Sequence, residues 1–185
     1  MKRVMLFAVI SLALAATPSL AQHAQPYAGM QMRPLKALSD EQLADLQAGR
    51  GMGLALAAEL NGYPGPSHVL ELQKELGLTE PQRSRVQQLF DAMKAETVPI
   101  GQRLIVAETD LDRQFAERTV TPASLDAATG AIGATQARLR AAHLKYHLAM
   151  LELLTPEQVR RYGELRGYGT ATPAGHSPGM HRHGN

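Results

Sequence analysis

Apolar side chains recur at helical spacing over two long segments of the chain. In the first, from Pro81 to about Arg118, they fall three or four residues apart, and the pattern resumes in phase after Pro99. In the second, which begins at Thr121-Pro122, the same alternation runs from Leu125 to Leu153. Each segment predicts a long helix. Because only a short turn separates them, they predict an antiparallel helical hairpin.

Shorter helices are predicted before the hairpin. Ser39 and Gln42 have the spacing of a capping box, which marks a helix start. Met52–Leu60 is a short apolar helical piece, and Ser67 is expected to cap a further helix that runs through Leu76. No apolar alternation is long enough for strands. The predicted fold is therefore all-α: a long antiparallel helical hairpin with short flanking helices, which we expect to form a homodimer.

The first 21 residues have the pattern of a secretory signal peptide. Two cations precede an apolar run, which ends in the small-x-small sequence Ser19-Leu20-Ala21. We expect cleavage after Ala21 and a periplasmic protein, since no lipidation cysteine follows. The apolar run is shorter than the ~20 residues of a membrane span, so no transmembrane helix is expected. The expected organisation is a signal peptide at 1–21, a flexible arm at 22–38, a helical hairpin domain at 39–166 and a tail at 167–185.

Composition and charge exclude several classes of function. The chain has 185 residues and no cysteine, so it cannot form a disulfide in an oxidising compartment. Without residues 1–21, Lys and Arg fall from 19 to 17 and equal the 17 Asp and Glu, which is not the charge of a nucleic-acid-binding surface. The sequence has neither a nucleophile elbow nor a glycine-rich phosphate loop. We therefore expect no enzymatic activity and no nucleic-acid partner.

One short motif, L-T-x-x-Q, occurs twice, each time at a predicted helix start. The first copy lies at residues 78–82 and the second at residues 154–158. In each, the threonine can accept a hydrogen bond from the first free amides, and the glutamine three residues later completes a capping box. The motif residues are Leu78, Thr79, Gln82, Leu154, Thr155 and Gln158.

These two motifs, with the helical hairpin between them, give residues 67 to 166 a resemblance to a known superfamily. They resemble the periplasmic proteins that include the Spy and CpxP envelope-stress proteins, the zinc-responsive ZraP and the CnrX-type heavy-metal sensors. The resemblance implies an all-α periplasmic protein, often a dimer of interlocked hairpins, without enzymatic activity. It also implies one of two functions: sensing or buffering metal ions, or binding unfolded clients without ATP.

We expect the first of these functions, a metal-binding or heavy-metal-responsive accessory protein of the sensor or resistance type. The alternative is an ATP-independent chaperone or envelope-stress modulator similar to Spy and CpxP. The partners that the resemblance implies are a second copy of the chain, unfolded client proteins or a membrane-bound signalling partner.

Three side chains that could bind a metal share one flank of the second long helix. With Tyr146 at the centre of the apolar face, His143, His147 and Met150 all lie to one side. Histidines four residues apart can reach one ion, and a thioether can join them if the metal is soft. The further donors available are Glu59, His68 and Glu71. The alternative is that these histidines only fill space beside the apolar face.

The C-terminal tail carries a second group of donors. After Gly167 the sequence is rich in Gly and Pro and contains His176, Met180, His181 and His183. Such a tract can bind Cu or Ni weakly, although it can equally be only a solvated tail. We expect no obligatory cofactor, and the ions that the candidate donors suit are Cu, Ni, Co and Zn.

Overall fold

The computed structural model describes residues 26–168, and the regular structure in that range is entirely helical. A short 3-10 helix, η1 (Met30–Met32), belongs to a separate unit that ends at Met32. The remaining helices are α1 (Asp40–Ala48), α2 (Leu56–Glu59), α3 (Pro66–Glu71), α4 (Glu80–Ala116), α5 (Pro122–Leu153) and α6 (Pro156–Leu165). The all-α prediction is confirmed, whereas the homodimer stays a prediction.

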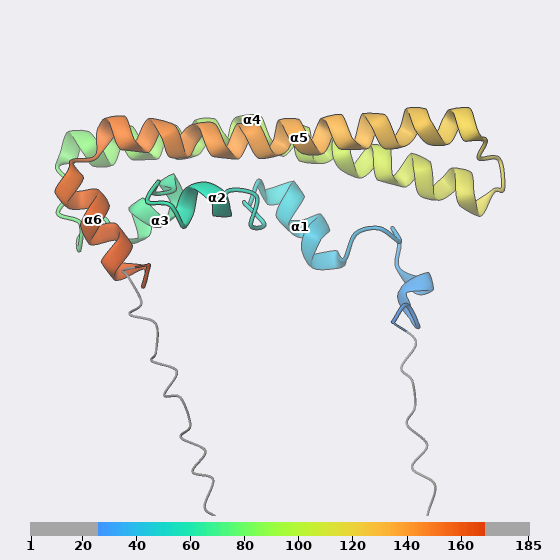
Figure 1. Cartoon of the computed structure of the whole chain (residues 1–185), viewed down its shortest axis with the longest axis horizontal. Coiled ribbons are helices and arrows are strands. Elements are labelled where there is room, and N and C mark those ends of the chain that lie inside the picture. The colour runs from blue at the N-terminus through green and yellow to red at the C-terminus, as the bar shows by residue number, and fades with distance from the viewer. Residues whose placement is uncertain (1–25, 169–185) are drawn as a thin grey trace, which may run out of the picture. The chain divides into compact units, whose positions relative to one another are not determined.

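The two long helices, α4 and α5, form the predicted hairpin (Figure 1). They run antiparallel and are joined by a turn at residues 117–121. Thr79 and Thr121 begin them with capping boxes, and α4 continues through Pro99. No helix among residues 26–168 is both long and apolar enough to cross a membrane.

The short helices α1, α2 and α3 lie along one side of the hairpin (Figure 1). Helices α1 and α3 contact α4, and α2 and α3 contact α5. The approach of α1 is close: a Cβ atom at Gly101 of α4 would lie 2.6 Å from the carbonyl oxygen of Leu46. Glycine at this position therefore allows the backbones of α1 and α4 to touch.

Helix α3 differs from the prediction at both ends. It begins at Pro66, after a Gly65 N-cap without a side-chain hydrogen bond, and it ends at Glu71 rather than Leu76. Ser67 is therefore not the cap. Proline suits the first turn because its φ is already helical and it lacks the N–H that would need a partner, so the helix starts two residues earlier than a Ser67 cap would place it.

Helix α2 is shorter than the predicted piece Met52–Leu60. Only Leu56–Glu59 is α-helical, because Met52 (φ 47°) and Gly53 (φ 75°) both have left-handed backbone conformations. The resulting turns bring α2 back against α5.

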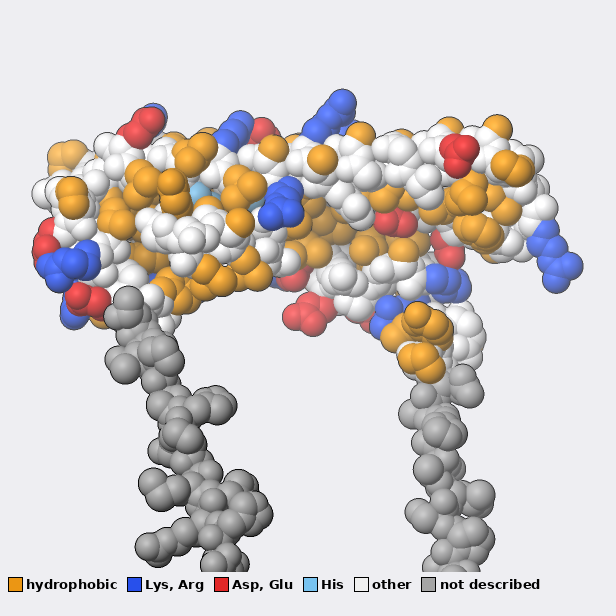
Figure 2. Space-filling model, viewed as in Figure 1, with side chains coloured by type: hydrophobic (Ala, Val, Ile, Leu, Met, Phe, Trp, Pro, Cys, Tyr) orange, Lys and Arg blue, Asp and Glu red, His pale blue; other side chains and the backbone are white. Residues whose placement is uncertain are grey.

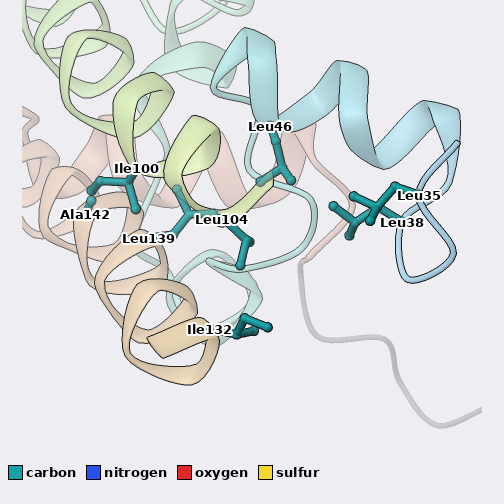
Figure 3. Close-up of a cluster of buried hydrophobic side chains, with 8 residues drawn as sticks. All are labelled: Leu35, Leu38, Leu46, Ile100, Leu104, Ile132, Leu139 and Ala142. Atoms are coloured by element: carbon teal, nitrogen blue, oxygen red, sulfur yellow. The ribbon is translucent and has the colours of Figure 1, made fainter. Parts of the chain in front are cut away.

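Two clusters of buried apolar side chains hold the helices together. The central cluster, drawn in Figure 3, joins α1 to the middle of the hairpin. It also contains Leu35 and Leu38 from the segment expected to be a flexible arm, so the packed part of the chain begins before residue 39. The end cluster lies where α3 and α6 meet the hairpin; its buried members are Val69, Leu76, Val86, Met150, Leu154 and Tyr162.

Candidate functional site

The two L-T-x-x-Q motifs meet at the open end of the hairpin. The side-chain amide of Gln82 donates to Oε1 of Gln158 at 2.9 Å, and the amide of Gln158 donates back to Oε1 of Gln82 at 3.1 Å. Each Oε1 also accepts from the backbone N–H of its own threonine, at 3.1 Å for Thr79 and 3.0 Å for Thr155. We call this reciprocal contact the amide pair.

The amide pair also reaches the backbone of neighbouring segments. Nε2 of Gln82 donates to the carbonyl oxygen of Leu153 at 3.1 Å, and Nε2 of Gln158 donates to that of Leu76 at 3.4 Å. Each glutamine side chain therefore makes three hydrogen bonds beyond its own capping box. The sequence predicts both capping boxes but not this contact between them.

A cavity of about 570 Å³ lies between the short helices and the hairpin. Figure 2 shows patches of hydrophobic side chains on the visible face, and little histidine surface is visible there. The cavity nevertheless gathers most of the donors predicted within the helical domain: Glu59, His68, Glu71, His143 and His147 line it. Met52 and Met93 line it as well.

His147 is held so that one ring nitrogen remains available. His147 is 7% exposed, and its Nδ1 lies 2.7 Å from the carbonyl oxygen of Tyr63. A carbonyl oxygen can only accept, so Nδ1 carries the proton and Nε2 of the neutral ring has a free lone pair. Gly65 leaves space beside it, since a Cβ there would lie 3.2 Å from Nε2. Metal-binding histidines are commonly oriented by such a bond.

His143, one helical turn earlier, is still more buried. It is 2% exposed, and among the described residues its Nε2 has no hydrogen-bond partner. Burial, and next the proximity of His147, lower the pKa of His143. The imidazole is therefore kept neutral, with a buried nitrogen that lacks a protein partner.

Glu59 places a buried carboxylate beside these rings. Its Oε1 accepts from the hydroxyl groups of Tyr162 and Tyr168, the latter at 3.2 Å, and lies 3.4 Å from Nε of Arg166. Its Oε2 lies 3.8 Å from Nδ1 of His147 and has no hydrogen-bond partner within the described chain. Burial and the hydrogen bond to Glu59 raise the pKa of Tyr162, so that its hydroxyl stays a donor.

The other predicted ligands fall into three groups. His68 and Glu71 line the cavity but pair with each other, with 2.9 Å between Nδ1 and Oε2; His68 is partly exposed and Glu71 is exposed. Met150 is fully buried in the end cluster and does not line the cavity. The tail donors His176, Met180, His181 and His183 lie outside the described residues.

The described residues supply metal-binding donors at the cavity but not a complete set of ligands. Within residues 26–168, no group of three or more His, Asp or Glu side chains is close enough together to hold one ion. The available chemistry is that of two histidine rings and a buried carboxylate oxygen at one cavity.

Comparison with known families places most of the chain in one family. Residues 52–161 match the family model described as heavy-metal resistance, and this range is more than half of the chain. The chain belongs to the heavy-metal resistance family. This membership confirms the resemblance that the two motifs indicate, because the family is that of the CnrX-, ZraP- and Spy-like L-T-x-x-Q proteins. Neither curated proteins nor solved structures gave a match.

The part of the chain that matches the heavy-metal resistance family contains both motifs and all the donors that line the cavity. It ends at residue 161, before Arg166 and Tyr168 and before the tail.

Proposed function

We propose that this protein is a non-enzymatic, exported metal-binding accessory protein, of the sensor or resistance type, that holds a transition-metal ion in the cavity. One observation carries the proposal: His143 and His147, one turn apart on α5, both line the cavity, and neither Nε2 has a hydrogen bond in the described chain. Membership of the heavy-metal resistance family supports a metal-related function in general.

The donor set fits a transition metal. Imidazole binds Zn, Cu, Ni and Co well, and it must be neutral to do so. The lowered pKa of His143 favours the neutral form. Met52 and Met93 add two thioethers to the cavity wall, which would suit copper(I) if that is the ion. A bound ion would also place positive charge near the buried Oε2 of Glu59.

The test measures binding of Zn²⁺, Cu²⁺, Ni²⁺ and Co²⁺ by calorimetry in a background where the four tail donors are replaced by alanine. We expect His143→Ala with His147→Ala to remove binding while the helical circular dichroism spectrum is retained, since alanine is the better helix former. Met150→Leu is the matched control: it lies on the same helix but outside the cavity, and it should bind normally. Equal binding by the double variant would refute the proposal.

An alternative function has its own observation. Val106, Phe115 and Leu148 are 61%, 54% and 58% exposed on the two long helices. Exposed apolar side chains of this kind can bind unfolded clients or a second copy of the chain. An ATP-independent chaperone therefore remains the second candidate. Suppression of a client protein's aggregation, without any metal binding, would favour it over the first.

We also propose a periplasmic location, supported by the signal-peptide pattern at residues 1–21. Cell fractionation tests it, and the full-length chain in the cytoplasm would contradict it. The homodimer is tested by sedimentation, where a monomer at micromolar concentration would contradict the prediction.

A further inference from the structure

The buried side-chain atoms that lack a hydrogen bond within residues 26–168 all lie at the cavity. They are Oε2 of Glu59, Nε2 of His143 and Nε of Arg166, and each of these residues lines the cavity. Glu59 is 6% and His143 is 2% exposed, so bulk water barely reaches either group. Buried polar groups in native proteins nearly always have a partner. Three unpartnered atoms at one cavity therefore indicate a ligand.

These atoms require partners of opposite charge. A carboxylate oxygen can only accept a hydrogen bond or bind a cation, whereas a guanidinium N–H can only donate. Nε of Arg166 lies 3.4 Å from Oε1 of Glu59 without a hydrogen bond, and its Nη2 donates to the hydroxyl of Tyr168 at 3.1 Å. A second cation, Lys94, lines the cavity with its ammonium group 5.7 Å from the centre of the Phe90 ring. A bare metal ion would suit Glu59 but would be repelled by Arg166 and Lys94.

Open space lies directly beside two of the candidate ligands. Gly65 has no side chain, and a Cβ there would lie 3.2 Å from Nε2 of His147 and 3.5 Å from Oε2 of Glu59. Both atoms therefore border the same open space. A cation in this space would interact with the imidazole and the carboxylate, and the rest of the cavity can hold a larger group.

The cavity is larger than an ion requires and has too few ligands for one. Structural zinc sites have four protein ligands, and within residues 26–168 no three His, Asp or Glu side chains are close enough together to hold an ion. The cavity volume of about 570 Å³ lies within the range of about 300–1,000 Å³ that is usual for organic ligands. Its apolar lining includes Met52, Leu56, Phe90 and Met93. A small organic molecule with an apolar group can therefore fill the cavity and supply the missing ligands.

We propose that the cavity binds its metal ion as a complex with an α-amino acid that has an apolar side chain, rather than as a bare ion. His143 and His147 supply two ligands, and the amino nitrogen and one carboxylate oxygen of the amino acid supply two more. The second carboxylate oxygen accepts from Arg166, and Lys94 adds positive charge at the same cavity. This inference rests on the proposed metal-binding function and names the chemical form in which the ion is bound.

The first test compares Zn²⁺ alone with an equimolar mixture of Zn²⁺ and leucine. Binding is measured by calorimetry on the full-length chain with the four tail donors replaced by alanine. Because a chelator in solution competes for the ion, a site for the bare ion must bind more weakly when leucine is added. We expect instead an apparent affinity about tenfold higher, the value of one charge-assisted hydrogen bond. Leucinamide, which lacks the carboxylate, and glycine, which lacks the apolar side chain, should each give a smaller gain.

Substitution of the two cations tests recognition of the carboxylate. Arg166→Gln and Lys94→Met should each reduce the gain from leucine without weakening the binding of Zn²⁺ alone. Arg161→Gln and Lys74→Met are matched controls, since both residues are exposed and lie outside the cavity. These two variants should keep the full gain. Circular dichroism checks that each variant remains folded.

A second measurement does not depend on the folding of a variant. In equilibrium dialysis with radiolabelled leucine, the chain should retain one leucine per bound Zn²⁺ and should retain none without Zn²⁺. Leucine retained equally with and without Zn²⁺ would overturn the inference, because the amino acid would then not be bound through the ion.

The outcomes separate this inference from the proposed function. Weaker Zn²⁺ binding in the presence of leucine would overturn the inference and leave the cavity as a site for the bare ion. An equal gain with leucinamide, or a gain that survives in both Arg166→Gln and Lys94→Met, would also overturn it. Zn²⁺ binding that is unchanged by His143→Ala with His147→Ala, whether leucine is present or not, would overturn both proposals.

Discussion

Replacement of Gln82 by alanine tests whether the amide pair stabilises the fold. Four of the hydrogen bonds of this side chain, at 2.9 to 3.1 Å, join it to Gln158, to Leu153 and to the N–H of Thr79. At about 0.5–1.5 kcal/mol net per bond, with some groups regaining water, its loss should lower the free energy of unfolding by about 2–4 kcal/mol. Gln158→Ala should cost a similar amount.

Gln42 provides a matched control for that substitution. It completes the capping box of α1, where its Oε1 accepts from the N–H of Ser39 at 2.8 Å, but it has no partner in another motif. Gln42→Ala should therefore cost only about 0.5–1.5 kcal/mol, the value of one hydrogen bond. The difference between the two glutamines measures the contacts beyond the capping box.

The decisive measurement is a double-mutant cycle by urea denaturation, followed by circular dichroism at 222 nm. Because the two bonds between Gln82 and Gln158 are lost in either single variant, the combined variant should cost about 1–2 kcal/mol less than the sum of the two. Gln82 and Gln42 should be additive within about 0.5 kcal/mol. Additivity of Gln82 and Gln158 would refute the amide pair as a stabilising contact.

Two further predictions concern the hairpin. Gly101→Ala should be destabilising because the new Cβ would lie 2.6 Å from the carbonyl oxygen of Leu46. Gly133→Ala, at an open helical position, should instead raise the free energy of unfolding by about 0.5–1 kcal/mol. Thermal melts measure both variants, and equal effects would refute the close approach of α1 to α4. Hydrogen bonds from Lys145, and to a smaller extent from Tyr146, lower the pKa of Glu96. The contribution of Glu96 to the free energy of unfolding is therefore present above its usual pKa and is lost as pH falls through the lowered pKa. Because Glu96 is partly exposed, the stability lost on acidification should be below about 1 kcal/mol. Urea titrations at pH 7 and pH 3 should show that Lys145→Met reduces the difference in the free energy of unfolding between the two pH values. An unchanged difference would contradict the role given to the contact between Glu96 and Lys145.

Local patterns predict most of the helices, because capping and amphipathic spacing act within a few residues. Ser39, Thr79, Thr121 and Thr155 all form capping boxes, the first two and the last with the expected glutamine. Helix α3 was misplaced because Pro66 begins it before the serine can act as a cap.

The spacing of residues within one segment does not predict contacts between segments that are distant in the sequence. The positions of His143 and His147 on one helical flank follow from the sequence, but their burial follows from α2 and α3, which cover that flank. Glu59 could be named as a donor, yet nothing local indicates that Tyr162, Tyr168 and Arg166 surround it. Met150 was predicted beside the histidines and instead packs in the end cluster, where its side chain is fully buried.

The amide pair also has a consequence for the rates of folding and unfolding. It joins residues 76 positions apart, whereas contacts near the turn at 117–121 join residues close in sequence. Contacts between residues close in the sequence cost less loop-closure entropy and should form first. We therefore expect α4 and α5 to pair from the turn outward and the amide pair to form after the transition state. A contact made that late slows unfolding without speeding folding. The second motif thus sets how long the hairpin stays closed, and Gln82→Ala should shorten that lifetime while refolding proceeds at its normal rate.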